Sequence, residues 1–344
     1  MSPRLLALAT AVPPHVLDAP TVARCARAIF GPAQAERLVP ILANSGIERR
    51  HSCVPPEWYP QRHGWAERSR LFADNAVDLA CQAAGRCLDR ARVAADQVDA
   101  VVAVSTSGIC TPSLDALVAE RMGLRRDVMR LPVFGLGCAG GVLGLARAGA
   151  LARAMPGARV LLLVVELCGL TFRPDDDSKS NLIATALFGD GAAAALVGPG
   201  GDGPVIAAWG EHTWADSLDV MGWHIEDDGF GVLFSRDIPA LVRERFRPAL
   251  DAWLDRAGIP FASLAGFCCH PGGAKVVAAL EESLGLPAGA LAHERAVLRD
   301  YGNMSAATVL FVLERALTSP MPGRRLATAL GPGFTAGFLV LDGG

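Results

Sequence analysis

The chain has 344 residues, and its 32 basic and 35 acidic side chains leave a net charge of −3 without a long basic run, which argues against nucleic acid as a partner. Apolar residues make up 51% of the chain, yet no uninterrupted apolar run reaches the roughly 18 residues of a membrane span. Nine irregularly spaced cysteines, and a first segment that resembles a strand more than a signal peptide, predict free thiols and a cytoplasmic location.

The first half of the chain alternates predicted strands with predicted helices. Apolar runs predict strands at 5–11, 98–105, 130–134, 159–167 and 187–197. Apolar residues at helical spacing predict helices at 19–30, 35–43, 74–91 and 113–122. Asp18 or Thr21 is the expected N-cap of the first helix, and residues 45–60 predict a loop rich in charge and proline. This alternation favours an α/β fold.

Cys138 lies between the predicted strand at 130–134, expected to be buried, and a segment of small residues that predicts a further helix. Gly140, Gly141 and Gly144 come early in that helix, where each costs about 1 kcal/mol relative to alanine. Their presence predicts that another backbone approaches closely. A helix N-terminus favours a thiolate, so Cys138 is a candidate nucleophile. A small cysteine buried in the core is the alternative interpretation.

The second half follows a predicted linker at 199–204. Its apolar runs predict strands at 205–209, 231–235, 264–269, 325–330 and 335–341. Helical spacing predicts helices at 238–257, 273–284 and 303–318. His270 comes directly after one of these strands, and loops at the carboxyl ends of strands often build functional sites.

The two halves repeat the same order of elements at a nearly constant offset. Cys138 and Asn303 each open a helix, 165 residues apart, and the strands that follow begin at 159 and 325, 166 residues apart. We interpret this as an internal duplication, with halves at 1–198 and 199–344. Packing about a pseudo-twofold axis would place Cys138 and Asn303 on facing helix N-termini, with His270 between them.

These three side chains suit acyl transfer. An imidazole can form an ion pair with a thiolate, and that pair predicts a lowered pKa for Cys138. The His270 and Asn303 N–H groups are suitable donors to an oxyanion, and asparagine remains a donor at any pH. The alternatives are a core histidine and an asparagine that caps a helix.

Five segments carry a resemblance to a known family: LGCAGG, LFGDGAAAALV, CCHPGGAKVV, YGNMSAATVLFVLE and GPGFTAGFLVL. In this order they resemble the type III polyketide synthases, the chalcone synthase-like enzymes of the thiolase fold. The resemblance implies a homodimer with duplicated halves in an αβαβα layered arrangement. It implies that Cys138 carries the starter and the growing chain as a thioester. His270 and Asn303 would bind the malonyl-CoA carbonyl and stabilise the enolate, with no metal or redox cofactor.

The resemblance also implies a substrate pocket. Phe188 matches a gatekeeper phenylalanine, Gly331, Pro332 and Gly333 match a loop that shapes the cyclisation cavity, and Arg37 is a candidate for binding coenzyme A. Thr171 and Ser305 are the residues found in the plant enzymes. Four further pocket positions differ from the plant residues: Thr111, Cys168, Trp223 and Val232.

The stretches at 175–194 and 221–239 are most similar to bacterial synthases that make alkylpyrones and alkylresorcinols from fatty acyl-CoA. We therefore expect an acyl-CoA starter, malonyl-CoA extension and an alkyl-bearing ring. The alternatives are a malonyl or aromatic starter, a β-ketoacyl-ACP synthase III-like enzyme, and an inactive scaffold of the same fold. Starter length, the number of extensions, the mode of ring closure and delivery by an acyl carrier protein stay open.

Overall fold

The computed structural model describes residues 2–176, 178–319 and 322–343, without the side chains of 31–35, 37 and 39. Within this part of the chain, nine strands form one hydrogen-bonded sheet in the order β11-β12-β13-β8-β1-β7-β6-β4-β5. The residue pair Arg4 and Val205 joins β1 to β8 at the middle of this order. The sheet is therefore built from two smaller sheets, one from each half of the chain.

The two smaller sheets share a pattern of pairing. The first contains β1 (Arg4–Ala11), β4 (Ala100–Val104), β5 (Met129–Val133), β6 (Val160–Leu167) and β7 (Asp190–Gly198). The second contains β8 (Val205–Thr213), β11 (Leu264–Cys269), β12 (Arg324–Gly331) and β13 (Thr335–Asp342). In the first sheet, β4 and β6 pair in parallel, and the pairs β6–β7 and β7–β1 are antiparallel. In the second sheet, β11 and β12 pair in parallel, and the pairs β12–β13 and β13–β8 are antiparallel. The repeat supports our proposed division into 1–198 and 199–344.

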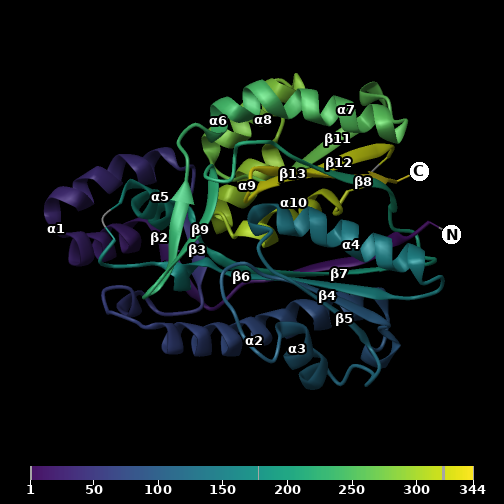
Figure 1. Ribbon diagram of the computed structural model, residues 1–344, viewed down its shortest axis with the longest axis horizontal. Helices are drawn as coiled ribbons and strands as arrows, with labels where there is room; N and C mark the ends of the chain where they lie inside the picture. The colour runs from purple at the N-terminus through teal and green to yellow at the C-terminus, as the bar shows by residue number, and fades with distance from the viewer. Residues whose placement is uncertain (1, 177, 320–321, 344) are drawn as a thin grey trace.

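Helices cover both sheets and separate them (Figure 1). One outer layer contains α2 (Trp65–Ala91) and α3 (Leu114–Met122), and the other contains α6 (Ile238–Leu241), α7 (Arg247–Ala257) and α8 (Ala274–Leu284). Between the sheets lie α4 (Gly140–Ala154) and α10 (Thr308–Ala316). This is the αβαβα arrangement of the thiolase fold, and it confirms the predicted fold class.

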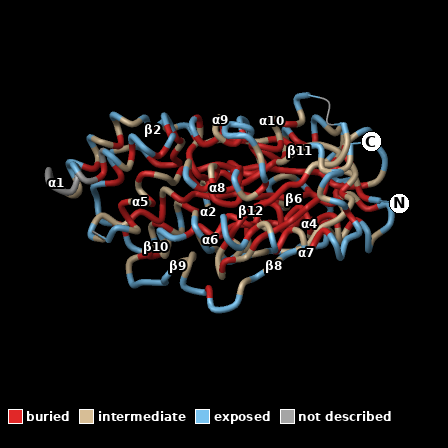
Figure 2. The backbone as a smooth tube through the Cα atoms, turned by 90° about the horizontal axis from the view of Figure 1, so that it is seen from above, coloured by how far each residue is buried: buried red, intermediate tan, exposed pale blue. Residues whose placement is uncertain are grey.

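Strand β6 shows why the central strands are almost entirely apolar. All eight of its residues are buried. Leu161 and Leu163 belong to the core beneath α2, whereas Leu162 and Val164 belong to the core around α4 and α10. Successive side chains of a strand point to opposite faces, so a strand covered by helices on both faces is apolar on both. Glu166 is the exception in β6, and its Oε2 atom accepts hydrogen bonds from Thr106 and Ser107. Figure 2 shows this buried core running through the middle of the molecule.

Several predicted elements differ from those observed. One helix, α1 (Ala19–Asn44), replaces the two that were predicted, because tertiary packing against α5 (Lys179–Leu187) supports it as one piece. Its N-cap is Asp18, which accepts a hydrogen bond from the Thr21 amide at 2.9 Å. The predicted loop at 45–60 contains β3 (Arg49–Ser52), which pairs with β2 (His15–Asp18).

Other differences lie in the second half and at one sheet edge. The helix α9 (Ala292–Tyr301) was not predicted, and a π-helical turn at Val242–Phe246 separates α6 from α7. The hairpin β9 (Met221–Glu226) and β10 (Gly229–Phe234) extends the predicted strand at 231–235. The strand expected to be buried at 130–134 is β5, which lies at the edge of the sheet and is partly exposed because only β4 pairs with it. Among the described helices, none combines the length and apolar character needed to cross a membrane.

Candidate active site

Two helix N-termini from the two halves meet at the centre of the molecule. Cys138 lies in the 3-10 turn Gly137–Ala139 that leads into α4, and Asn303 lies just before the turn Ser305–Ala307 that leads into α10. A Cβ atom at Gly141 would lie 2.2 Å from the Ala306 carbonyl oxygen. Glycine is therefore required for this approach, and the close contact predicted from the glycines is confirmed.

The approach brings the candidate catalytic side chains together. The Cys138 thiol points to Asn303 Oδ1 at 4.0 Å. Asn303 Oδ1 also accepts a hydrogen bond from the Ser305 amide at 2.9 Å, and Asn303 Nδ2 donates to the Gly272 carbonyl at 3.1 Å. His270, which follows β11, lines the same buried pocket, here called the Cys138 pocket. The rest of that pocket is mainly apolar and includes Met221, Phe234, Ile238, Phe246, Val276, Leu280 and Leu330.

Burial decides the ionisation of Cys138 and His270. It raises the pKa of Cys138 to about 12, although hydrogen bonds with Ser305 and Asn303 act in the opposite direction. It also lowers the pKa of His270 to about 3, and within the described residues neither ring nitrogen has a hydrogen-bond partner. The lowered pKa that we predicted for Cys138 is therefore wrong for this structure, because desolvation disfavours the charged form of both groups. The pair is a neutral thiol and a neutral imidazole.

Glu166 is a buried carboxyl near the nucleophile that our sequence analysis missed. Its Oε2 atom accepts hydrogen bonds from the Thr106 amide at 3.1 Å and from the Ser107 hydroxyl at 2.6 Å. Burial raises the pKa of Glu166 to about 7. The Thr106 hydroxyl in turn accepts from the Gly137 amide at 2.9 Å, so this network supports the turn that carries Cys138. The available signal was a single acidic residue in a strand whose other seven residues are all apolar.

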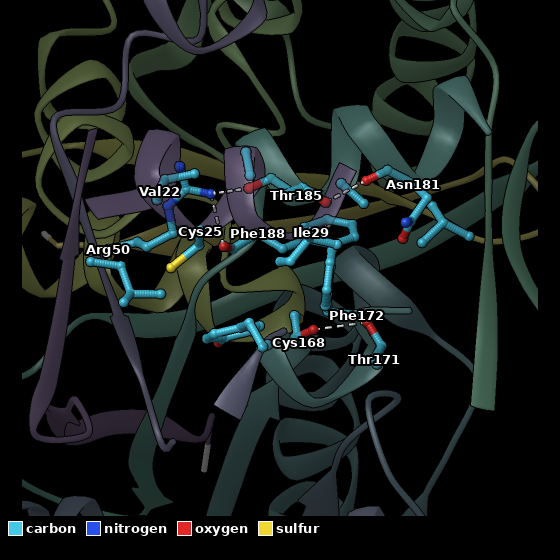
Figure 3. A pocket seen from close by; sticks show the side chains of 16 residues that line it. Val22, Cys25, Ile29, Arg50, Cys168, Thr171, Phe172, Asn181, Thr185 and Phe188 are labelled. Atoms are coloured by element: carbon cyan, nitrogen blue, oxygen red, sulfur yellow. Dashed lines mark hydrogen bonds between the residues drawn. The ribbon is translucent and has the colours of Figure 1, made fainter. Parts of the chain in front are cut away.

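Four predicted substrate-binding residues line a second pocket, beneath α1. They are Cys168, Thr171, Phe188 and Val232. We call this cavity the α1 pocket, and Figure 3 shows the side chains that surround it. Its other apolar lining comes mostly from α1 and the segments below it: Leu17, Val22, Ala26, Ile29, Phe172 and Ala184. Burial raises the pKa of Cys168, and nearby Glu166, Asp190 and Cys138 raise it further, which places this pocket close to the nucleophile.

Three further predicted features contact the same region. Trp223 donates from Nε1 to the Thr106 carbonyl at 3.1 Å, and its ring lies 6.0 Å from that of Phe188. A Cβ atom at Gly137 would lie 2.4 Å from Pro332, so the loop Gly331, Pro332 and Gly333 packs on the turn of the nucleophile. Ser305 has a positive φ of 46°, an uncommon conformation for a residue with a side chain.

Two predicted residues are not placed at either pocket. Thr111 is exposed on the surface of the single chain. Arg37 belongs to α1, but its side chain lies outside the described residues. Their predicted roles in binding substrate and coenzyme A therefore stay proposals.

Comparisons with known proteins agree with this fold. Residues 2–201 match the description "Chalcone and stilbene synthases, N-terminal domain", and residues 212–343 match the corresponding C-terminal domain. A crystal structure of 1,3,6,8-tetrahydroxynaphthalene synthase from Streptomyces coelicolor A3(2), a bacterial type III polyketide synthase, superimposes with a TM-score of 0.93. The identity is 29%, and the alignment covers 98% of this chain and 99% of the other.

Curated relatives are similar over most of their length. The 1,3,6,8-tetrahydroxynaphthalene synthase of Streptomyces peucetius subsp. caesius is 38% identical, over 97% of this chain and 92% of its own. The 3,5-dihydroxyphenylacetyl-CoA synthase of Amycolatopsis orientalis is 31% identical, over 86% of this chain and 82% of its own.

The fold thus defines a condensing enzyme of the thiolase type. The chain belongs to the chalcone and stilbene synthase family and is a type III polyketide synthase. It is an acyltransferase of the kind that performs decarboxylative condensation with malonyl-CoA. This assignment decides against the β-ketoacyl-ACP synthase III alternative.

Proposed function

We propose that Cys138, His270 and Asn303 carry out the condensation, because all three line one buried pocket at facing helix N-termini. In loading, the Cys138 sulfur attacks the thioester carbonyl of the starter, and His270 accepts the thiol proton. The bond between that carbonyl and the coenzyme A sulfur breaks, and His270 returns the proton to this sulfur, so that coenzyme A leaves as its thiol. A base is needed for this step because burial keeps Cys138 protonated. His270 is the candidate for that base because its imidazole lines the same pocket as the Cys138 thiol.

The extension step uses donors rather than bases. Malonyl-CoA loses carbon dioxide, and the electron pair of the broken bond forms an enolate whose oxygen needs hydrogen-bond donors. The Asn303 amide has two N–H groups, and one of them donates to Gly272, which leaves the second for that oxygen. A neutral His270 also retains one N–H. The enolate carbon then attacks the thioester carbonyl on Cys138, and the bond between that carbonyl and the Cys138 sulfur breaks. The sulfur leaves as a thiolate that takes up one proton, and the chain, two carbons longer, is now a thioester of coenzyme A.

For the starter, we propose a medium or long fatty acyl-CoA, with an alkylpyrone or alkylresorcinol as the product. The α1 pocket supports this proposal because its lining is mostly apolar and four of its residues are predicted substrate contacts. Val232, a small side chain, lines this pocket, and the ring of Trp223 packs edge-on against that of Phe188, another lining residue. The name of one relative, 1,3,6,8-tetrahydroxynaphthalene synthase, favours a second candidate, a synthase whose product is a polyhydroxylated aromatic ring without an alkyl tail.

The test is kcat/KM for acyl-CoA starters from acetyl to stearoyl, with malonyl-CoA as extender and products identified by mass spectrometry. Each buried methylene contributes about 0.8 kcal/mol, so kcat/KM should rise roughly three- to fourfold per carbon until the pocket is full. Ala26→Phe, which fills the α1 pocket, should move the plateau to shorter chains. Ala28→Phe, on the exposed face of α1, is the matched control. A flat profile, or a preference for malonyl-CoA alone, would contradict the fatty starter.

We propose that the working form is a homodimer in which β5 lies at the interface. β5 is an edge strand, and an open strand edge is usually covered or paired. Three large apolar side chains in β5 and in the segments that follow β4 and β5 are about half exposed: Ile109 at 51%, Met129 at 46% and Phe134 at 52%. Thr111 lies beside Ile109 in sequence, so a role for it in substrate binding would depend on a second copy covering this surface.

The dimer should have twice the chain mass of 35.9 kDa in size-exclusion chromatography with light scattering. Phe134→Glu should shift the population toward the monomer because it places a charge in the buried contact. Asp127→Lys, which changes a nearby exposed charge, serves as a control for altered net charge. A wild-type protein that is monomeric at micromolar concentration would refute the proposal.

We also propose that the enzyme needs no cofactor and acts in the cytoplasm. The thiol, imidazole and amide groups supply the proposed chemistry, so activity should survive exhaustive dialysis against a chelator. The structure describes all nine cysteines as free thiols, which suits a reducing compartment. Cell fractionation measures the location directly.

A further inference from the structure

Arg50 is a buried cation that neither the family match nor our sequence analysis assigns to the reaction. Strand β3 alternates its side chains, so the Arg49 side chain remains 58% exposed whereas Arg50 points inward and is 4% exposed. Arg50 lines the α1 pocket next to Phe188, as Figure 3 shows. A guanidinium in such a position loses its hydration and needs a compensating partner.

That partner is the end of α5 rather than a carboxylate. Nη1 of Arg50 donates to the carbonyl oxygens of Thr185 at 2.6 Å and Phe188 at 3.3 Å. These carbonyls belong to the last turn of α5, where backbone acceptors are free and the helix dipole attracts a cation. Within the described residues no carboxylate forms an ion pair with Arg50, and its Nε atom has no partner. Arg50 therefore fixes the C-terminal end of α5.

The end of α5 is joined by its main chain to Asn303. The main-chain N–H of Asn303 donates to the main-chain carbonyl of Leu187 at 2.8 Å. The main-chain N–H of Gly189 donates to the main-chain carbonyl of Asn303 at 3.0 Å. Phe188 and Asn303 thus form an isolated parallel bridge. Arg50 packs against both strands of this bridge, at the glycines next to Phe188 and Asn303. A Cβ atom added to Gly189 would lie 3.1 Å from the Cβ atom of Arg50, and one added to Gly302 would lie 3.4 Å from it.

We propose that Arg50 is a positioning residue. It holds Phe188 in place and, through the main-chain bridge, it holds the side-chain amide of Asn303 in position relative to Cys138. This inference rests on the proposed role of Asn303 as an enolate donor. A donor displaced by about 1 Å can slow a reaction by roughly 100-fold, so a side chain that fixes the donor affects the rate without contacting substrate. Loading on Cys138, which depends less on Asn303, should be less sensitive.

The experiment compares Arg50→Met and Arg50→Lys with Arg49→Met, a neighbouring arginine on the exposed side of the same strand. Two rates are measured per folded enzyme: malonyl-CoA decarboxylation, and acylation of Cys138 followed by intact-protein mass spectrometry. Thermal unfolding reports the folded fraction. For Arg50→Met we expect kcat of decarboxylation to fall about 10- to 100-fold, and acylation to fall by much less. Arg50→Lys retains one charged donor and should recover part of the loss, whereas Arg49→Met should resemble the wild type.

The outcomes separate the possible explanations. If both rates fall in parallel, Arg50 has only a general structural role and the proposal is overturned. If Arg50→Met does not fold, Arg50→Lys decides, because a normal ratio of decarboxylation to acylation in that variant also overturns the proposal. Asn303→Ala is measured alongside. A normal decarboxylation rate in Asn303→Ala would contradict the proposed function itself. If decarboxylation is slow in Asn303→Ala but has the wild-type rate in the Arg50 variants, only the inference about Arg50 is rejected.

Discussion

Replacing Cys138 with alanine should abolish acyl loading and product formation. The methyl group of alanine cannot form a thioester, and no acyl-enzyme should appear in the intact-protein mass spectrum after incubation with acyl-CoA. Decarboxylation of malonyl-CoA should persist, because His270 and Asn303 remain at the Cys138 pocket to hold the enolate. The separation of these two activities is the specific expectation of a site in which the nucleophile and the enolate donors are different residues.

Cys268→Ala is the matched control for this change. Cys268 is also a buried cysteine, 1% exposed, in strand β11 two residues before His270. Its replacement should leave loading intact, which would show that the loss in Cys138→Ala does not arise from removing any buried thiol. An acyl-enzyme that still forms in Cys138→Ala would show that another residue is the nucleophile.

Replacing Asn303 with alanine should lower the rate of malonyl-CoA decarboxylation by roughly 10²–10³-fold, the usual effect of losing one oxyanion donor. Loading on Cys138 should be less affected. The measurement is release of carbon dioxide from malonyl-CoA, alongside the rate of acylation. If acylation fell as far while decarboxylation stayed normal, our assignment of the roles would be reversed.

Asn303→Asp separates the donor role from a capping role. Asn303 Oδ1 accepts a hydrogen bond from the Ser305 amide, and aspartate can retain this contact because it is also a good N-cap. Aspartate has no N–H to donate, so Asn303→Asp should be as slow in decarboxylation as Asn303→Ala. A fast Asn303→Asp enzyme would indicate that capping, and not donation, is the function of Asn303.

Much of the site could be predicted from local sequence because its parts lie at the ends of regular elements. The glycines after Cys138 indicated a close approach, which Gly141 and Ala306 make. The constant offset between the halves placed Cys138 opposite Asn303. Long apolar runs identified strands such as β6, because a strand covered on both faces buries almost every side chain in an apolar layer.

The sequence by itself therefore predicted most of the strands of the large sheet, the repeat between the halves and the three candidate catalytic residues, since these depend on periodicity and on residue type at element ends. Only the tertiary structure decided their electrostatics, because burial depends on neighbours distant in sequence: it raises the pKa of Cys138 and lowers that of His270, against our prediction. The tertiary structure also brings Glu166 into contact with Thr106, which supports the turn that carries Cys138, and Arg50 to the end of α5. Neither contact has a local pattern, because each joins segments more than 50 residues apart.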